Sequence, residues 1–398
     1  MKKKNIQVLL IGVGSLRNYG CEGIVQGTYA MFRKFWPECE LVVATENPNA
    51  DRITFAGYEN IRFIKDAKRV TLYRLWKGFL RRFLKIGKGS AVRINTQLVK
   101  GKDIFLSCGG DNFCESPDGT LYFILQDLMT CGVKAKQNDS FYALWGASVG
   151  PFNSINEPRI TSNLQLADLI FVREKLAYSY VNSIGISAPK LKLIADPAFC
   201  MSPDMSHLLE KKDDDIFIGL NISALAFSSV DYATFGQLLS IDPKVRLLCI
   251  PHVMSSRGGP QDDFLFLQNF IRSLNHSENR IILLPENLGA RKTKGCIAQC
   301  DILIASRMHA CVAGVSVGTP TLFLTYSNKG KGMAEYVYGH QDWTLSNKRI
   351  TESDLLNKVQ KMLKKKEEIK QYLMANHIRF KEDASLSIIE LKKNYFKE

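Results

Sequence analysis

One stretch near the C-terminal third decides the fold of this chain: Asp301-Ile-Leu-Ile-Ala-Ser-Arg307-Met-His309-Ala-Cys-Val-Ala-Gly-Val-Ser-Val-Gly-Thr-Pro-Thr-Leu-Phe-Leu-Thr325. Its first apolar run is short and rich in β-branched residues, which predicts a strand, and the Ala/Val/Gly run after His309 predicts a buried helix. The Gly-Thr-Pro turn ends that helix before a second apolar run. Strand, helix and strand in this order indicate a parallel α/β sheet.

Arg307 and His309 follow this strand directly, where the helix begins. Ligands of open α/β sheets bind at that edge, and the N–H groups and dipole of a helix start favour an anion there. A permanent cation two residues from a titratable imidazole therefore predicts a site that binds an anionic substrate and transfers a proton. The alternative is a capping arginine and a histidine with a structural role in the core.

The alternation of strand and helix continues along most of the chain, and a polar, charged segment divides it. We therefore predict an α/β protein with two Rossmann-like domains and an interdomain cleft, the architecture of the B-type glycosyltransferases. The predicted parts are an N-terminal Rossmann-like domain at 1–203, a linker at 204–215, a C-terminal Rossmann-like domain at 216–345 and basic helices at 346–398.

The segment Asp168-Leu-Ile-Phe-Val-Arg173 repeats the logic of the stretch that ends in Arg307: an aspartate, apolar residues, an arginine and then a helix. The likeness is short. It nevertheless predicts that each domain ends one strand with an arginine at its ligand-binding edge, Arg173 in the first domain and Arg307 in the second.

Composition limits the class of protein and of partner. The chain has 398 residues, of which 45% are hydrophobic and 23% charged, as expected for a soluble globular enzyme of two domains. An excess of 53 Lys+Arg over 39 Asp+Glu gives a net charge of +14, which suits phosphorylated substrates, anionic lipid or nucleic acid. No nucleic-acid-binding signature accompanies the charge, so we predict no nucleic-acid partner.

The ten cysteines form no CxxC pair and no zinc-binding spacing, and several lie in apolar runs. This pattern predicts a reducing, cytoplasmic location and no metal site. The apolar run that begins at Ile6 lacks a cleavage pattern and leads into a glycine-rich loop, so we predict a first strand rather than a signal peptide. No window approaches 18 consecutive apolar residues, so no membrane span is predicted.

Two glycine-containing loops in the first half follow predicted strands. In the first, Asn18 and Glu22 are polar groups near a helix start, although the spacing does not fit a dinucleotide fingerprint. In the second, Gly109 and Gly110 allow a substrate close to the backbone, and Asp111 can accept a hydrogen bond or a proton from a sugar hydroxyl. The alternatives are a tight turn with a helix cap and an aspartate that caps a turn.

Two further features carry possible chemistry. His252 follows a predicted strand and can orient a substrate oxygen or carry a proton, or it can be a structural histidine. The segment 69–102 alternates cations with Leu, Trp, Phe and Tyr at helical spacing, as in helices that lie on an anionic membrane surface. A helix packed on its own domain is the alternative for this segment.

Seven short motifs, in this order and spacing, resemble the polysaccharide pyruvyl transferase family, over most of the chain up to about residue 330. They are Asn18-x-Gly20-x-Glu22, Cys108-Gly-Gly-Asp-Asn-Phe113, Trp145-Gly-Ala-Ser-Val-Gly-Pro151, Phe171-Val-Arg-Glu174, Asp196-Pro-Ala-Phe199, Pro251-His252 and Ser306-Arg-Met-His309. The chain departs from the family at Asp111, where a third glycine is usual.

The resemblance implies transfer of pyruvate from phosphoenolpyruvate to two hydroxyls of a sugar, forming a ketal on a capsular, exopolysaccharide or cell-wall repeat. It implies a glycosyltransferase-B-like fold, no cofactor, and an oligosaccharide or lipid-linked acceptor, which would place the protein on the inner face of the cytoplasmic membrane. Phosphoenolpyruvate carries a phosphate and a carboxylate, so two separated arginines suit it. The assigned roles are substrate binding for Arg173, Arg307, Asn18, His252, Gly109 and Gly110, general acid for His309, and proton acceptor for Asp111, Glu22 or His252.

Two other functions fit the residues. A B-type glycosyltransferase that uses a nucleotide sugar would need a carboxylate for the ribose, and Glu286 is placed to serve. A non-catalytic protein would use Arg307 to bind an anion or a lipid, with His309 inert. Phosphate release from phosphoenolpyruvate in the presence of a sugar acceptor separates the three.

Overall fold

The computed structural model describes residues 6–67, 94–115, 119–227, 232–255, 261–274, 278–325, 328–347 and 350–397. Most of the basic segment predicted at 69–102, namely residues 69–93, therefore lies outside the described residues. The chain forms two compact units, which we describe separately. Unit 1 comprises residues 1–16, 31–194 and 386–398, and unit 2 comprises residues 17–30 and 195–385.

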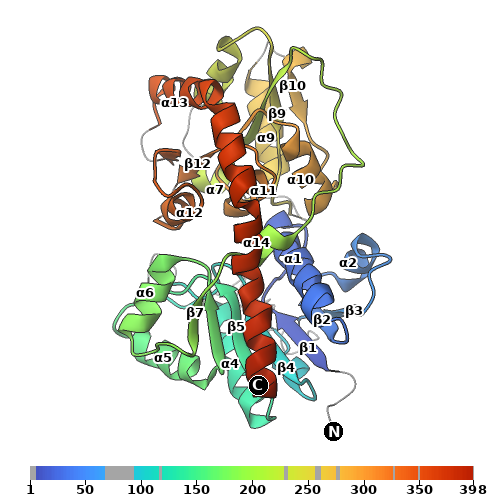
Figure 1. Ribbon diagram of the computed structural model, residues 1–398, viewed down its shortest axis with the longest axis vertical. Coiled ribbons are helices and arrows are strands. Elements are labelled where there is room, and N and C mark those ends of the chain that lie inside the picture. Colours follow the sequence, from blue (N-terminus) through green and yellow to red (C-terminus); the bar gives the residue numbers. More distant parts are fainter. Residues whose placement is uncertain are drawn as a thin grey trace, which may run out of the picture. The chain divides into compact units, whose positions relative to one another are not determined.

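The described part of unit 1 contains a seven-stranded parallel sheet, with the strands in the order β3-β2-β1-β4-β5-β6-β7 (Figure 1). The strands are β1 (Gln7–Ile11), β2 (Glu40–Thr45), β3 (Ile61–Lys65), β4 (Ile104–Cys108), β5 (Phe141–Ala147), β6 (Leu169–Val172) and β7 (Leu191–Leu193). The helices that lie wholly in this unit are α2 (Pro48–Thr54), η1 (Thr96–Val99), α4 (Phe123–Gln137), α5 (Glu157–Leu166) and α6 (Lys175–Ser183). The last part of α1 (Tyr19–Phe35) also belongs to it.

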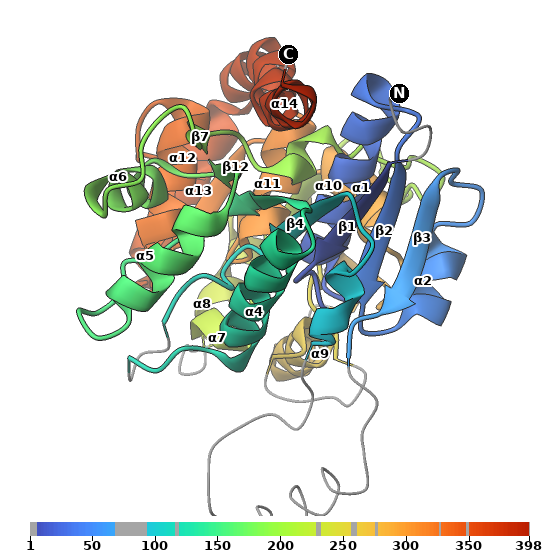
Figure 2. The ribbon, with the colours of Figure 1, turned by 90° about the horizontal axis from the view of Figure 1, so that it is seen from below.

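Helices cover both faces of this sheet, as its apolar strands predict. On one face, α4 and α5 enclose the main hydrophobic cluster with residues of β1, β2, β4 and β5 (Figure 2). On the other face, Phe32 of α1 lies against Trp145 of β5, and Phe141 lies against Tyr395 near the C-terminus. Every residue of β4 is buried, which explains why its sequence, apolar except for Ser107, does not alternate between apolar and polar residues.

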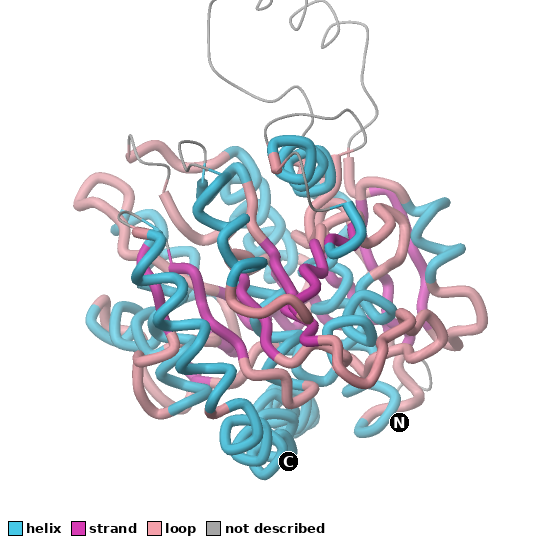
Figure 3. The backbone as a smooth tube through the Cα atoms, turned by 90° about the horizontal axis from the view of Figure 1, so that it is seen from above, coloured by secondary structure: helices cyan, strands magenta, loops and turns pink. Residues whose placement is uncertain are grey.

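The described part of unit 2 contains a six-stranded parallel sheet in the order β10-β9-β8-β11-β12-β13, with helices beside the strands (Figure 3). The strands are β8 (Ile216–Asn221), β9 (Val245–Cys249), β10 (Ile281–Leu283), β11 (Ile302–Ala305), β12 (Thr321–Thr325) and β13 (Thr344–Ser346). The helices include η2 (Pro197–Cys200), α7 (Ala224–Phe227), α8 (Tyr232–Gly236), α9 (Asp263–Ser273), α10 (Ala290–Ala298), α11 (Met308–Ser316), α12 (Asn328–Tyr338), α13 (Glu352–Lys364) and α14 (Lys366–Phe396). The predicted fold class, with two Rossmann-like parallel sheets, is confirmed.

The sequence likeness between Asp168 and Asp301 has a structural counterpart at the starts of the strands. Each aspartate precedes a strand and accepts a hydrogen bond from a backbone N–H near the start of the neighbouring strand, and Asp103 does the same. The bonds run from Gln7 to Asp103 (2.9 Å), from Tyr142 to Asp168 (2.8 Å) and from Phe217 to Asp301 (2.9 Å). The aspartate thus marks the amino edge of these three strands, and the arginine that follows β6 and β11 marks their carboxyl edge.

Neither compact unit is continuous along the sequence. Residues 17–30, the first part of α1, belong to unit 2, because they pack closely on the segment that starts at residue 195. A Cβ on Gly27 would lie 1.9 Å from the carbonyl oxygen of Pro197. The predicted linker belongs to unit 2, where Leu209 donates its N–H to Gln299. Residues of α14 belong to both units.

Candidate functional site

The strand order of each sheet reverses direction once, and ligands of such sheets bind outside the carboxyl ends of the two strands on either side of the reversal. In unit 1 these strands are β1 and β4, and in unit 2 they are β8 and β11. The segment that begins at Gly109 follows β4, and the segment Ser306-Arg307 follows β11. The motifs found in the sequence therefore lie at the carboxyl edge of each sheet, as predicted.

In unit 2, a buried carboxylate fixes the guanidinium of Arg307. Its Nη2 lies 2.7 Å from Oδ1 of Asp263, and its Nε lies 3.3 and 3.2 Å from the two carboxylate oxygens. Asp263 also accepts the N–H groups of His252 (3.2 Å) and Val253 (3.0 Å). Burial raises the pKa of Asp263, whereas Arg307 and the two amides act in the opposite direction. Such a bidentate pair holds Arg307 in one orientation.

One edge of Arg307 remains available to a ligand. Within the described residues, Nη1 of Arg307 has no hydrogen-bond partner, while Nη2 also donates to the carbonyl oxygen of Gln261 (3.2 Å). Arg307 is the N-cap residue of α11, and no side chain caps that helix start. The buried hydroxyl of Ser306 donates to Ser223 (3.4 Å) beside it. A guanidinium edge next to an uncapped helix start is suited to an anion.

His309 lies in the first turn of α11 and contacts a fully buried carboxylate. Its Nε2 is 3.3 Å from Oδ2 of Asp196, whose Oδ1 accepts the N–H of Ala198 (2.8 Å). The imidazole retains 17% of its exposure. On its other side the ring packs against Gly20 of α1, where an added Cβ would lie 2.4 Å from Nδ1. The imidazole of His309 is therefore in contact with Asp196 on one side and with Gly20 on the other.

His252 is buried in the same unit, between Arg307 and the start of α1. Burial, with the nearby His309 and Arg307, lowers the pKa of His252 to about 3. Its ring meets that of Tyr19 edge to face, with 5.8 Å between the centroids. At neutral pH this histidine is uncharged, so it can accept a hydrogen bond but cannot serve as an acid, and its low pKa makes it a weak base.

The other predicted residues of unit 2 hold local structure. Oδ1 of Asn18 accepts the N–H of Gly20 (2.9 Å) at the start of α1. The buried carboxylate of Glu22 accepts the N–H of Ala290 (2.9 Å), the first residue of α10. Glu22 thus caps a second helix start, which favours a negative charge.

In unit 1, Arg173 lies beneath the glycine turn that follows β4. Its Nε donates to the hydroxyl of Ser148 (3.1 Å), and its Nη2 is 3.5 Å from Oδ1 of Asp111. Only 3% of the Arg173 side chain is exposed, against 63% for Asp111. A Cβ on Gly110 would lie 2.6 Å from Nη2, so this glycine makes room for Arg173 itself.

Gly109 is constrained in a similar way. Its φ of +123° favours glycine, and an added Cβ would lie 1.7 Å from Nδ2 of Asn112. Asn112 donates to the carbonyl oxygens of Gly12 (2.8 Å) and Cys108 (3.1 Å). Both glycines are therefore required by the chain's own side chains. Their predicted role in substrate approach stays a prediction.

The structure brings together Arg307, His309 and His252 in unit 2, and Arg173 and Asp111 with the two glycines in unit 1. Sequence reasoning missed Asp263 and Asp196, which fix Arg307 and His309. A signal existed for Asp196, because it lies in one of the family motifs. Asp263 carried no signal, since it lies 44 residues from Arg307 in the sequence.

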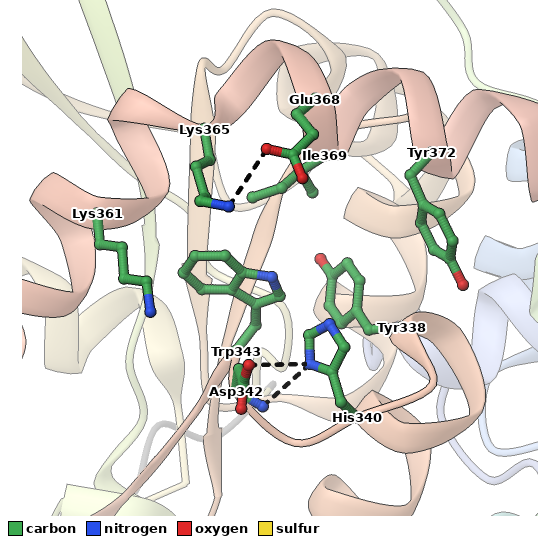
Figure 4. A pocket seen from close by; sticks show the side chains of 9 residues that line it. All are labelled: Tyr338, His340, Asp342, Trp343, Lys361, Lys365, Glu368, Ile369 and Tyr372. Carbon is green, nitrogen blue, oxygen red and sulfur yellow. Dashed lines mark hydrogen bonds and ion pairs between the residues drawn. The ribbon is translucent and has the colours of Figure 1, made fainter.

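A cavity of about 190 Å³ lies elsewhere in unit 2, and no motif pointed to it (Figure 4). It is lined by aromatic and charged side chains of the segment before β13 and of α13 and α14. The charged groups interact with one another: Lys365 lies 3.3 Å from Glu368, and His340 lies 3.8 Å from Asp342. The positive and negative side chains of the lining pair with one another, so the cavity shows no preference for a cationic or an anionic ligand.

Two kinds of feature are absent from the described residues. No group of three or more His, Cys, Asp or Glu side chains is arranged to hold a metal ion in the described ranges. No helix in the described part of the chain has the length and apolar character needed to cross a membrane. The predictions of no cofactor and of a cytoplasmic location are not tested by these findings.

Comparison with protein families gave one match. The family model described as "Polysaccharide pyruvyl transferase" matches residues 18–328, most of the chain. That range contains Arg173, Arg307 and His309, together with Asp196 and Asp263. A comparison with curated protein sequences found no match.

Solved structures are similar in fold at low sequence identity. A UDP-N-acetylglucosamine 2-epimerase has a TM-score of 0.63 at 14% identity, over 99% of this chain and 97% of that chain. The UDP-GlcNAc 2-epimerase of Neisseria meningitidis bound to UDP-GlcNAc has 0.61 at 10% identity, over 99% and 100%. The Anabaena protein HepE in complex with UDP and glucose has 0.60 at 10% identity, over 98% and 99%. These similarities show the fold alone.

Proposed function

Because the chain belongs to the polysaccharide pyruvyl transferase family, we propose that it transfers pyruvate from phosphoenolpyruvate to two hydroxyls of a sugar and forms a cyclic ketal. One observation supports this most directly: Arg307 and His309 follow β11 at the strand reversal of unit 2, beside an uncapped helix start. A cation and an imidazole at such an edge are what an anionic enol phosphate requires.

In the proposed reaction, an anionic group of phosphoenolpyruvate binds Nη1 of Arg307 and the start of α11. Arg173 of unit 1 is the proposed second cation, because the donor carries both a phosphate and a carboxylate. The imidazolium of His309 gives a proton to the methylene carbon, which leaves a cationic centre at C2. A sugar hydroxyl attacks C2, inorganic phosphate leaves, and a second hydroxyl closes the ketal.

The attacking hydroxyls must lose their protons, and the three predicted acceptors differ in their surroundings. Asp111 is largely exposed, so a substrate can reach its carboxylate. Glu22 already accepts the Ala290 amide, and His252 is buried and uncharged. Asp111 is therefore our preferred proton acceptor, with His252 and Glu22 as supports of the site.

A second candidate function is transfer or epimerisation of a nucleotide sugar, because similar solved structures contain UDP-GlcNAc or UDP. In this chain Glu286, the proposed ribose ligand, forms an ion pair with Arg17 at 3.5 Å, and both side chains are part-exposed. No observation on the chain favours the nucleotide sugar over phosphoenolpyruvate, and the family membership favours pyruvyl transfer.

The deciding experiment incubates the purified protein with phosphoenolpyruvate and a synthetic sugar acceptor that has two suitably spaced hydroxyls. The expected products are inorganic phosphate and a ketal visible by NMR as a quaternary carbon. The same protein is incubated with UDP-GlcNAc and with UDP-glucose. Release of UDP or epimerisation, with no phosphate from phosphoenolpyruvate, would contradict the proposal and support the second function.

We also propose that the acceptor is a lipid-linked oligosaccharide of a capsular, exopolysaccharide or cell-wall polymer, and that the enzyme works on the inner face of the cytoplasmic membrane. This rests on the sequence of segment 69–102, most of which lies outside the described residues. Each cation near an anionic surface adds about 1 kcal/mol of binding. Flotation with anionic and neutral vesicles tests it, with Arg74, Lys77, Arg81 and Arg82 replaced by Ser; equal flotation of wild type and variant would reject it.

A further inference from the structure

The cavity of about 190 Å³ in unit 2 lies at the opposite sheet edge from Arg307. Trp343 directly precedes β13 and so lies at the amino edge of this strand, whereas Arg307 follows β11 at the carboxyl edge. The strands β11, β12 and β13 are parallel neighbours in one sheet. The segment 338–343 forms one part of the lining, and α13 and α14 form the other. The cavity is therefore separate from the candidate functional site.

A tryptophan and two tyrosines give this cavity fixed aromatic surfaces. Trp343 and Tyr338 are each only 6% exposed, so packing holds their rings in place. The hydroxyl of Tyr338 accepts the N–H of Thr321 (3.0 Å) and donates to its carbonyl oxygen (3.1 Å). Tyr372 is 40% exposed and donates its hydroxyl to the carbonyl oxygen of Val337 (3.1 Å). Because both hydroxyls already have partners, the tyrosines present mainly their rings to the cavity.

Polar groups with unused hydrogen-bonding capacity line the same space. Among the described residues, the indole Nε1 of Trp343 has no hydrogen-bond partner, although the side chain is almost completely buried. Figure 4 shows this nitrogen on the side of the indole that faces Tyr338. The ammonium of Lys361 lies 5.9 Å from the indole centroid. Glu368 uses one carboxylate oxygen for Lys365 (3.3 Å), which leaves its other oxygen as an acceptor. The lining therefore offers both donors and an acceptor.

This combination suits a neutral polyhydroxy ligand. A sugar hydroxyl both donates and accepts hydrogen bonds, so the hydroxyls of one ring can use an indole N–H, an ammonium and a carboxylate together. The C–H face of a sugar ring packs on the negative face of an aromatic ring. The lysines of the lining, Lys361 and Lys365, are balanced by Asp342 and Glu368, so no excess charge favours an ion. The volume is below the roughly 300 to 1,000 Å³ of sites for larger ligands, and it suits a single ring.

We propose that this cavity is a saccharide-binding subsite that takes one neutral hexopyranose unit. The sugar ring packs against Trp343 and Tyr372, and its hydroxyls bind Nε1 of Trp343 and the carboxylate of Glu368. The inference goes beyond the proposed function, because it assigns a second binding site and no step of the reaction. Since the cavity and Arg307 lie at opposite edges of the sheet, the bound unit is a different one from the sugar that reacts. Binding can be measured without phosphoenolpyruvate, so failure of the proposed reaction would leave this test intact.

Saturation-transfer NMR on the full-length protein tests the class of ligand. The probes are the methyl glycosides of glucose, galactose and N-acetylglucosamine, together with choline as a cation and uracil as a neutral aromatic ring. We expect saturation of the ring protons of at least one glycoside, with a Kd of about 1 mM, a usual affinity for a ligand of this size. Transfer to choline or uracil and to none of the glycosides would overturn the proposal, as would transfer to none of the probes.

Substitutions in the lining locate the bound sugar. Tyr372→Phe and Tyr372→Ala both lose the bond to Val337, but only Tyr372→Ala loses the ring, so its Kd should be about tenfold higher than that of Tyr372→Phe. Trp343→Phe keeps an apolar ring and removes the N–H, so the Kd should rise by about 2- to 10-fold, the factor for one hydrogen bond.

Tyr122→Ala is the matched control for these substitutions. Tyr122 is a similarly exposed tyrosine (44%) in unit 1, so its replacement should leave the Kd unchanged. A Kd that stays at the wild-type value in either Tyr372→Ala or Trp343→Phe would place the sugar elsewhere and reject the subsite.

Discussion

The two strand-end arginines follow similar sequences but have different partners. Arg307 in unit 2 pairs at 2.7 Å with Asp263, whose side chain is fully buried, whereas Arg173 in unit 1 lies 3.5 Å from Asp111, whose side chain is 63% exposed. The carboxylate of the first pair is shielded from solvent, whereas that of the second pair is largely exposed to it. A strand followed by an arginine therefore predicts where a cation lies, and the long-range carboxylate decides how firmly it is held.

The two edges also differ in their capacity to move protons. All six histidines of the chain lie in unit 2, and His252 and His309 lie near Arg307. Unit 1 contains no histidine, so carboxylates such as Asp111 are its candidates for proton transfer at the glycine turn. Under the proposed function, this difference assigns protonation of the donor to unit 2 and deprotonation of the acceptor to unit 1.

The largest expected effect tests this division of roles. His309→Gln should lower turnover by about 10² to 10⁴, as expected when a general acid is lost, with a smaller effect on the KM for phosphoenolpyruvate. Steady-state kinetics with phosphate detection measures both, and His340→Gln, at an exposed position, is the control. If His309→Gln keeps near wild-type turnover while Asp111→Asn loses it, the proton chemistry lies in unit 1 and the comparison is reversed.

The second prediction concerns the arginines themselves. Arg307→Ala and Arg173→Ala should each weaken use of phosphoenolpyruvate by roughly 2 to 4 kcal/mol in kcat/KM, the scale for removing one partner of a close charge pair. Arg307→Ala should also destabilise the fold by about 3 to 5 kcal/mol, because it leaves Asp263 buried without its cation.

A double variant separates the two effects of Arg307. Arg307→Ala with Asp263→Ala should recover much of the lost stability in thermal denaturation, because no unpaired buried charge remains, yet it should not recover donor use. For Arg173→Ala we expect a smaller loss of stability than for Arg307→Ala, since Asp111 can turn to solvent. Unchanged donor kinetics in both single variants would reject the role of these arginines as donor ligands.

Much of this fold could be predicted from the sequence because its strands are short apolar runs bounded by turns. The strand predicted from the apolar run that begins at Ile6 corresponds to β1 (Gln7–Ile11), and the one predicted after Asp301 corresponds to β11 (Ile302–Ala305). The edges followed directly, because a residue after the last apolar position of a parallel strand must lie at the carboxyl edge. This reasoning placed Arg173, Arg307 and His309 just after their strands, as observed, and their roles in a site stay predictions.

The rest depended on contacts between distant segments, which leave no local pattern. Nothing near Glu22 indicates that it caps α10, since the partner residue Ala290 is 268 positions away. The contact between His309 and Asp196 likewise joins residues that are distant in the sequence. So does the close approach of Gly27 to Pro197, which places residues 17–30 in unit 2. Positions along the strands could therefore be predicted from the sequence, whereas contacts between distant residues could not.

The third prediction uses the buried histidine of unit 2. The pKa of His252 is lowered to about 3, mainly by burial, whereas an unfolded chain titrates near 6.5. Between these values the unfolded state binds a proton that the folded state does not, so stability should fall as pH drops, by up to about 1.4 kcal/mol per pH unit. Unfolding by urea from pH 7 to pH 4 measures this. The slope should flatten in His252→Gln and not in His340→Gln; equal slopes in all three proteins would show that other groups dominate.

The smallest effects are expected at the amino edges of the strands, where the two units use the same arrangement. Asp301 is held by Lys211 (2.7 Å) and Lys366 (2.5 Å), and Asp168 by Lys136 (2.8 Å). Burial alone would raise the pKa of Asp301, but the lysines and the amide of Phe217 outweigh it and lower the pKa. The stabilising contribution of Asp301 should therefore be present at neutral pH and be lost as pH falls through that lowered value.

Asp168→Asn should lower the free energy of unfolding by about 1 kcal/mol, because these part-exposed pairs are screened by solvent. Asp301→Asn should lower it by about twice as much, because it leaves two lysines without their carboxylate. Equal losses in urea unfolding would mean that the backbone bond alone matters, since asparagine can keep it in both units.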